Sequence, residues 1–214
     1  QWNIFWWPLG GENWQWQWLK PKDQKFGSKI IPANASYYDD SLWYFGGGKS
    51  DTLYQLKFAE RSTKERINPP TIKQLIGHKI TDYPKGIYGD IAINKEGILY
   101  GSQSNANNGK RLFYQINLNK LGQDDAYKVL NKDLKVKDPD TGECKSVGLQ
   151  LSFNETYNTL FGQTYGNNDG GNIRGAFYTF SFDEEADQEG EICPGGFNPK
   201  YTGYSVPDLN KFVA

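Results

Sequence analysis

Aromatic side chains near the start of the chain are the residues best suited to bind a ligand. Trp6 and Trp7 are adjacent in a short strand-like run, so their side chains point to opposite faces and cannot both be buried in one interface. An exposed flat ring is a platform for a sugar ring or for a partner's side chain. A similar aromatic run further along contains Trp43 and Tyr44. We therefore predict that these four residues bind the ligand, with burial at a subunit contact as the alternative.

A second group of tryptophans has the spacing of a core. Trp14, Trp16 and Trp18 fall on one face of a strand because side chains alternate across it. Rings of this size fill the space between packed sheets, where each buries about 150–250 Å². We interpret this triplet as core rather than as part of a ligand site.

Residues able to carry out hydrolysis are few. His78 is the single histidine, and hydrolytic triads usually need a histidine base beside a serine or cysteine elbow, which the sequence does not show. We expect His78 to be a surface loop residue. Asp39, Asp40 and Asp90 lie at strand ends, where paired carboxylates could serve a glycosidase or lyase, but no spacing places two of them at a catalytic separation. The sequence therefore predicts no catalytic residue.

A metal site has little support. Zinc requires three or four nitrogen or sulfur ligands, which one histidine and two cysteines do not supply. The segment Asp138–Glu143 starts like a calcium loop, yet Gly142 occupies the fifth position, where an oxygen ligand is needed, so we expect a turn. Asn167–Asn172 is rich in oxygen atoms, but its glycine pair fits a hairpin. We predict no cofactor, with weak calcium binding as the alternative.

Several features indicate a secreted glycoprotein. The chain contains no methionine, even at position 1, which we interpret as the result of signal-peptide removal. Two N-glycosylation sequons occur, at Asn34 and Asn154. Cys144 and Cys193 are the only cysteines, and we expect them to form a disulfide that stabilises the fold by roughly 4 kcal/mol. The alternative is two unrelated buried thiols.

A recurring pair of strands positions these residues. The second strand of each pair alternates large apolar with polar side chains. Its four copies are Trp14–Trp18, Tyr54–Phe58, Tyr114–Leu118 and Tyr178–Phe182. The first strands are Ile4–Trp7, Leu42–Phe45, Ile98–Gly101 and Thr159–Gly162. Turns rich in glycine and asparagine join the two strands, which predicts hairpins.

Further strands flank these pairs. Short runs precede three of them, at Lys29–Ile31, Gly89–Ile93 and Gly148–Phe153. Candidate outer strands are Thr71–Ile76 and Ala126–Leu130. Three or four strands in a unit of about 40 to 60 residues is the size of a propeller blade.

Two segments resemble blades of the β-propeller repeat families: Gly89–Gly101 with Lys110–Leu118, and Gly148–Gly162 with Ala176–Phe182. The resemblance implies an all-β fold, a small four-bladed propeller-like repeat in a single domain. The expected blades are residues 1–27 plus 196–214, 28–76, 77–130 and 131–195. We expect the C-terminal run Gly203–Val213 to close the ring by pairing with the N-terminal blade, which removes open sheet edges. An open β-sandwich or a partial propeller is the alternative.

The composition excludes several classes of partner. A net charge of −1, a pI near 5.9 and the lack of a lysine or arginine cluster argue against nucleic acid. Mean hydropathy is −0.74, and no apolar run approaches the ~18 residues of a membrane span. The acidic run Asp183–Glu191 is interpreted as a solvated loop, with weak cation binding as the alternative.

Together these features predict a secreted, non-enzymatic binding module, lectin-like, that recognises a glycan or an extracellular protein. One alternative is an extracellular structural or assembly protein, a homo-oligomer whose tryptophan-rich N-terminus is the interface. Another is a carboxylate- or calcium-dependent hydrolase or lyase with its site on one face of the propeller.

Overall fold

The protein is represented by a computed structural model that describes residues 2–6, 15–19, 34–45, 51–58, 72–83, 89–103, 111–164, 175–180, 193 and 200–205. For residues 2–6, 15–19, 72 and 200–205 only the backbone is described. These ranges are all-β, as the sequence predicts, apart from the short 3-10 helix η3 (Leu118–Lys120). They contain no helix that is long and apolar enough to cross a membrane.

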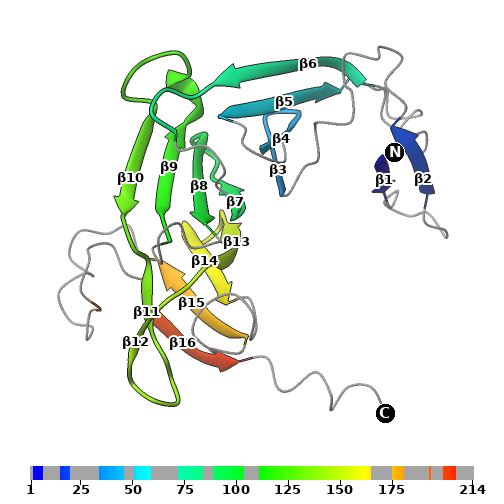
Figure 1. The fold of residues 1–214 in the computed structure, drawn as a ribbon. Coiled ribbons are helices and arrows are strands. Elements are labelled where there is room, and N and C mark those ends of the chain that lie inside the picture. Colours follow the sequence, from blue (N-terminus) through cyan, green and yellow to red (C-terminus); the bar gives the residue numbers. More distant parts are fainter. Residues whose placement is uncertain are drawn as a thin grey trace.

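Three four-stranded antiparallel sheets form most of the described structure (Figure 1). The first contains β3 (Ala35–Tyr38), β4 (Ser41–Phe45), β5 (Thr52–Phe58) and β6 (Ile72–Lys79). The second contains β7 (Gly89–Ile93), β8 (Ile98–Gln103), β9 (Phe113–Asn117) and β10 (Tyr127–Asn131). The third contains β13 (Leu149–Asn154), β14 (Thr159–Thr164), β15 (Ala176–Phe180) and β16 (Lys200–Ser205). In each sheet, consecutive strands are neighbours.

Two hairpins accompany the three sheets. One pairs β1 (Trp2–Trp6) with β2 (Gln15–Leu19), and the other pairs β11 (Lys135–Lys137) with β12 (Cys144–Ser146). The β1–β2 hairpin lies apart from the β13–β16 sheet (Figure 1). The β11–β12 hairpin lies beside that sheet, and the hydroxyl of Tyr178 in β15 donates a hydrogen bond to the carbonyl of Lys137 at 3.0 Å.

The cross-strand pairs show which residues of the repeats are equivalent. Leu42, Leu99 and Leu160 occupy one position, because each pairs with the residue two places after the tyrosine of the repeated strand. The next position but one is Tyr44 in the first sheet and Gly101 or Gly162 in the others. In the repeats expected from the sequence, Leu42 corresponds to Ile98, the first residue of the matching run. The pairing shows that Leu42 corresponds to Leu99 instead, which is a shift of one residue.

We call β3, β7 and β13, the first strand of each four-stranded sheet, the inner strands. β7 lies between β3 and β13, although the three strands belong to different sheets. Side chains join β7 and β8 to β13. The backbone N–H of Leu151 donates to Oδ2 of Asp90 at 2.8 Å, and the N–H of Leu149 donates to Oγ of Ser102 at 2.9 Å. These bonds fix how far the third sheet is shifted along the second.

The three inner strands run in the same direction. In β13, Phe153 follows Leu151 and stacks on Tyr100, the cross-strand partner of Ala92 in β7. Because Leu151 is bonded to Asp90, residue numbers rise together along the two strands. A Cβ added at Gly97, in the turn after β7, would lie 2.8 Å from the hydroxyl of Tyr38, the last residue of β3. The turns that follow β3, β7 and β13 therefore lie at the same end of the protein.

The middle sheet carries a core on each face, as period-two alternation requires. One cluster combines its residues Ile91, Ile93, Leu99, Tyr114 and Ile116 with Trp43, Phe45 and Leu53 of the first sheet. The other combines Ala92, Tyr100 and Phe113 with Leu149, Leu160, Tyr178 and Phe180 of the third sheet and with Leu134, Val136 and Val147 around the β11–β12 hairpin. Packing between neighbouring sheets therefore holds the three units together.

The expected closing strand pairs elsewhere. In β16, Tyr201 pairs with Tyr178 and Ser205 with Ala176, so residues 200–205 extend the third sheet instead of joining the N-terminal blade. The prediction is therefore wrong for residues 203–205, and residues 206–213 lie outside the described chain. The physical reason is the disulfide at Cys193, which holds the chain beside the third sheet shortly before β16 begins.

Two other expected boundaries also shift. Strand β6 continues to Lys79, with Gly77 and His78 paired to β5, so the first four-stranded sheet extends beyond residue 76. Gly77 lies inside this strand although glycine is rare in strand interiors. The inner strand of the first sheet is Ala35–Tyr38, whereas the run expected for it, Lys29–Ile31, lies outside the described residues.

The glycine at position 101 gives a test of this packing. A Cβ at Gly101 would lie 2.1 Å from the ring of Tyr114, which is fully buried between the first two sheets. We expect Gly101→Ala to lower the free energy of unfolding by about 1–3 kcal/mol, because the ring must shift in a filled core. Urea unfolding measures the change, with Ser152→Ala on an exposed position of β13 as the control. Equal stability of the two variants would contradict the packing.

Candidate functional site

The turns after the inner strands form the most distinctive surface of the described protein. We call residues 37–40, 94–97 and 154–158 the turn face, since they lie at the same end of β3, β7 and β13. Within the described residues, Tyr37 and Tyr157 are the only large apolar side chains that are exposed, at 60% and 75%. Both belong to the turn face.

The first turn joins β3 to β4 through Asp39 and Asp40. Both aspartates have φ of +48°, the left-handed conformation that a two-residue hairpin loop requires. The hydroxyl of Tyr37 donates to Oδ1 of Asp40 at 2.9 Å, and Oγ of Ser41 donates to the carbonyl of Asp39 at 3.0 Å. The turn therefore presents an aromatic ring beside a carboxylate that is held in place.

The second turn, Asn94–Gly97, contacts the first. Oδ1 of Asn94 accepts the N–H of Ile98 at 2.8 Å, which closes the loop. Gly97 has φ of +77° and lies against Tyr38. Lys95 and Glu96 occupy the tip, where their charged groups lie 3.8 Å apart and their side chains are 60% and 50% exposed. This turn contributes one carboxylate and one ammonium group to the turn face.

The third turn follows β13. Oδ1 of Asn154 accepts the N–H of Tyr157 at 3.2 Å, and Oγ1 of Thr159 donates to the carbonyl of Tyr157 at 2.8 Å. Asn158 has φ of +48°, a conformation that asparagine tolerates. Four consecutive residues, 155–158, are exposed. Local hydrogen bonds therefore fix a turn whose most exposed side chain is an aromatic ring.

The turn face combines rings with acidic groups. Its exposed carboxylates belong to Asp39, Asp40, Glu96 and Glu155, and its ammonium group belongs to Lys95. A ring offers a flat apolar surface to the C–H groups of a sugar, and carboxylates accept hydrogen bonds from sugar hydroxyls. Sequence reasoning missed Tyr37 and Tyr157. The available signal was a tyrosine beside turn-forming Asp or Asn residues, where a side chain has no facing sheet to cover it.

The structure distributes the predicted ligand-binding residues differently. Trp43 and Tyr44 are buried, at 4% and 6% exposure, so neither offers a ring face to solvent here. Nε1 of Trp43 donates to the carbonyl of Tyr38 at 3.1 Å, and Tyr44 stacks on Tyr54. Trp6 lies in β1, where only the backbone is described, and Trp7 lies outside the described residues. Trp43 and Tyr44 therefore do not belong to the turn face.

His78 has a different environment from the one expected. It lies half-buried inside β6, so its assignment to a surface loop is wrong. Its ring stacks on Trp43 with centroids 5.5 Å apart, and its Nε2 lies 3.3 Å from Oε1 of Gln55. Nε2 of Gln55 in turn donates to Oγ of Ser41 at 3.0 Å. These contacts connect the outer strand to the Asp39–Asp40 turn.

Asp90 has a structural environment. It lies near the start of β7, towards the end of that strand opposite the turn face. Oδ1 accepts the N–H of Ile91 at 3.0 Å and Oδ2 accepts that of Leu151. Burial raises the pKa of this carboxyl, and the two N–H groups oppose the increase. Asp90 therefore lies apart from Asp39 and Asp40, and its hydrogen bond to Leu151 joins the second sheet to the third.

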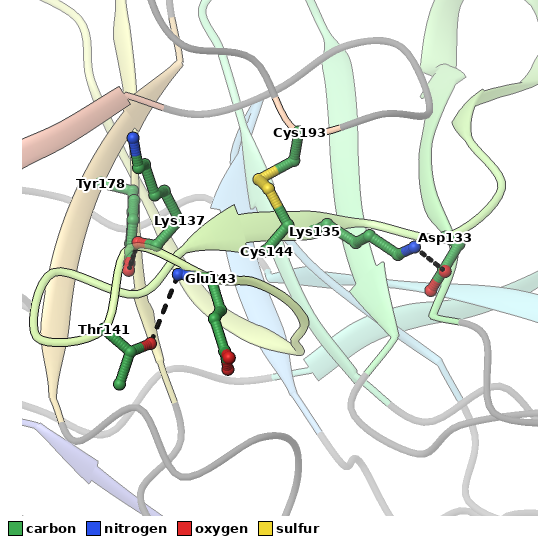
Figure 2. The surroundings of a disulfide bond; sticks show 8 residues. All are labelled: Asp133, Lys135, Lys137, Thr141, Glu143, Cys144, Tyr178 and Cys193. Carbon is green, nitrogen blue, oxygen red and sulfur yellow. Dashed lines mark hydrogen bonds and ion pairs between the residues drawn. A yellow bond between two sulfur atoms is a disulfide. The ribbon is translucent and has the colours of Figure 1, made fainter.

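The disulfide predicted from the sequence is present between Cys144 and Cys193, with Cα atoms 5.6 Å apart (Figure 2). It connects β12 to the segment that leads into β16. Cys193 is buried at 2%, whereas Cys144 is exposed. Asp133 beside this hairpin is paired with Lys135 at 3.5 Å (Figure 2).

The segment Asp138–Glu143 forms the expected turn. The N–H of Gly142 donates to the carbonyl of Asp138 at 2.8 Å, and Gly142 has φ of +71°. The carboxylate of Asp138 pairs with Lys145, an interaction that helps to lower its pKa against the opposing effect of burial. Asp138 is therefore already neutralised by a side chain of the same hairpin. The described residues contain no group of three or more His, Cys, Asp and Glu side chains suited to hold a metal ion.

Asn34 and Asn154, the two sequon asparagines, lie at opposite ends of inner strands. Asn34 comes just before β3, and Asn154 ends β13 at the turn face. Both are half-buried. The acidic run Asp183–Glu191 and the turn Asn167–Asn172 lie outside the described residues.

Comparison of the chain with protein-family models, curated proteins and solved structures finds no match. The geometry of the turn face is therefore the basis for assigning a function to the protein.

The single histidine allows a direct electrostatic test. Burial, followed by repulsion from Lys57, lowers the pKa of His78 from its usual 6.5. Below pH 6.5 the unfolded chain therefore takes up a proton before the folded one, so the free energy of unfolding decreases as pH falls from about 6.5 to the folded pKa. NMR titration of the one imidazole measures this pKa. A midpoint at or above 6.5 would show that His78 is not desolvated against Trp43.

The disulfide gives a stability prediction. We expect Cys144→Ser to lower the free energy of unfolding by about 2–5 kcal/mol, because the unfolded chain is no longer cross-linked. Urea unfolding of the variant is compared with that of the wild type after reduction by a thiol. The two should lose similar stability, since both lack the same bond. A variant as stable as the oxidised protein would mean that packing around Val136 alone holds the hairpin.

Proposed function

We propose that this protein is a secreted, non-enzymatic binding module that recognises a glycan through its turn face. The observation that carries the proposal is the position of Tyr37 and Tyr157. They are the exposed large apolar side chains of the described structure, and they lie at one end of the inner strands, Tyr37 near the end of β3 and Tyr157 in the turn after β13. Rings left in water on fixed turns cost free energy that ligand binding recovers.

The carboxylates support the same proposal. The hydrogen bond from Tyr37 orients Asp40 beside the ring, so a hydroxyl-bearing ligand that stacks on the ring meets an acceptor already in position. Preorganised acceptors reduce the entropy lost on binding. The disulfide is compatible with an extracellular environment, where such bonds persist.

The scaffold that we propose is a small four-bladed propeller. Three sheets with parallel, neighbouring inner strands are the arrangement of successive blades around an axis. In this proposal the β1–β2 hairpin belongs to a fourth blade, where Trp6 takes the position that Trp43 has in the first sheet, because their paired residues match. Turns on a propeller face converge on one surface, which suits a binding module.

A glycan array tests the proposed function. The purified protein is screened with and without calcium, and the affinity for the best ligand is then measured for variants. We expect Tyr37→Ala and Tyr157→Ala each to weaken binding about tenfold, which corresponds to about 1.4 kcal/mol for the loss of a stacked ring. Tyr157→Phe keeps the ring and serves as a matched control, and Lys73→Ala on an exposed position of β6 serves as a distant control. Tyr37→Phe also keeps the ring and measures the contribution of the hydrogen bond to Asp40.

Two results would contradict the proposal. One is a blank array in both conditions, and the other is binding that both alanine variants retain. A blank array together with a solution mass well above 24.4 kDa would favour the assembly protein instead.

A further inference from the structure

The sequon asparagine Asn154 is half-buried at the end of β13, where the turn begins. Oδ1 of Asn154 accepts the N–H of Tyr157, so the amide oxygen is directed toward the turn's own backbone. Among the described contacts, Nδ2 of Asn154 donates no hydrogen bond. The strand ladder ends at the pair Asn154 and Thr159, so residues 155–158 have no cross-strand partner.

The sequon's hydroxyl residue lies within the turn itself. Thr156 stands two places after Asn154 and is exposed, as are Glu155 and Tyr157 on either side of it. The core ends one residue earlier, at Phe153, which packs against the cluster of the third sheet. A large group on Nδ2 of Asn154 therefore extends from a hairpin tip without displacing core residues.

The other sequon has a contrasting environment. Ser36, its hydroxyl residue, lies half-buried within β3 and pairs with Trp43. Ala35 between the two sequon residues pairs with Tyr44 in the same ladder. Strand β3 also lies against β7, so this sequon is part of an inner strand at the junction of two sheets.

We propose that Asn154 is an N-glycan acceptor and that Asn34 is not. In the transfer, Nδ2 of Asn154 forms a bond to the anomeric carbon of a lipid-pyrophosphate-linked oligosaccharide. The bond from that carbon to the pyrophosphate oxygen breaks, the lipid pyrophosphate leaves with the electron pair, and Nδ2 loses one proton to a base. The inference needs passage through a secretory membrane and does not depend on the ligand proposed above.

A glycan at this position changes the turn face. Tyr157 lies three residues after Asn154 in the same turn, so the glycan occupies the space beside its ring. Tyr37 lies near the end of β3, on the far side of the β7–β8 turn. The modification therefore leaves the Tyr37 side as the open part of the surface.

Site-specific mass spectrometry tests this inference. The full chain is expressed behind a cleavable signal sequence in a eukaryotic secretory host, and both the cell-associated and the secreted protein are collected. Peptide-N-glycosidase in ¹⁸O-water marks each formerly glycosylated asparagine. We expect the mark at Asn154 in most molecules and its absence at Asn34. Occupancy at Asn154 should fall at least tenfold in Thr156→Ala and persist in Thr156→Ser, which keeps the hydroxyl, while Ser36→Ala should change nothing.

Two outcomes would overturn the inference: an unmarked Asn154 in the wild-type protein, or a mark at Asn34. Non-reducing peptide mapping detects the disulfide between Cys144 and Cys193, and its presence reports whether each variant has folded. Failure of glycan-array binding by protein made without the glycan would contradict the proposed function alone, whereas an unmodified Asn154 in protein from the secretory host would contradict this inference alone.

Discussion

The arrangement of the protein depends on how neighbouring sheets are fixed to one another without a shared strand ladder. Asp90 and Ser102 do this by accepting backbone N–H groups of β13, which sets the shift of the third sheet along the second. Asp90 is half-buried, and losing either N–H donor would leave its carboxyl oxygens partly desolvated without a partner. The two core clusters then fill the space that these bonds define. The common direction of β7 and β13, and hence the grouping of their turns, follows from this constraint.

Much of the fold could be predicted from the sequence because period-two alternation reports local burial. The repeated strands at Tyr54, Tyr114 and Tyr178 form, and so do the outer strands at Ile72 and Tyr127. The pairing of β16 could not be predicted, because strand partners depend on contacts distant in sequence. Residues 200–205 have no regular alternation that selects one sheet edge, and the position of Cys193 decided which edge was within reach.

The candidate site was harder to predict, since aromatic content does not report exposure. Trp43 lies in an aromatic run and is therefore a predicted ligand-binding residue. In the structure its strand is covered by the next sheet, and its indole N–H donates to the carbonyl of Tyr38. Tyr37, one residue before Tyr38, is exposed because it lies near the end of the β3–β4 ladder, where no facing sheet covers it. Distinguishing the two requires knowing which sheets face each other, and that is a property of the whole fold.

The disulfide also determines what happens when the backbone is cut. The loop between Cys144 and Cys193 spans 49 residues and contains β13, β14 and β15. A single hydrolysed peptide bond anywhere in that interval leaves both fragments covalently attached, with a mass gain of one water. The acidic run Asp183–Glu191 falls within the same interval. Nicking there would convert the protein into a two-chain molecule whose fragments separate only under reducing conditions.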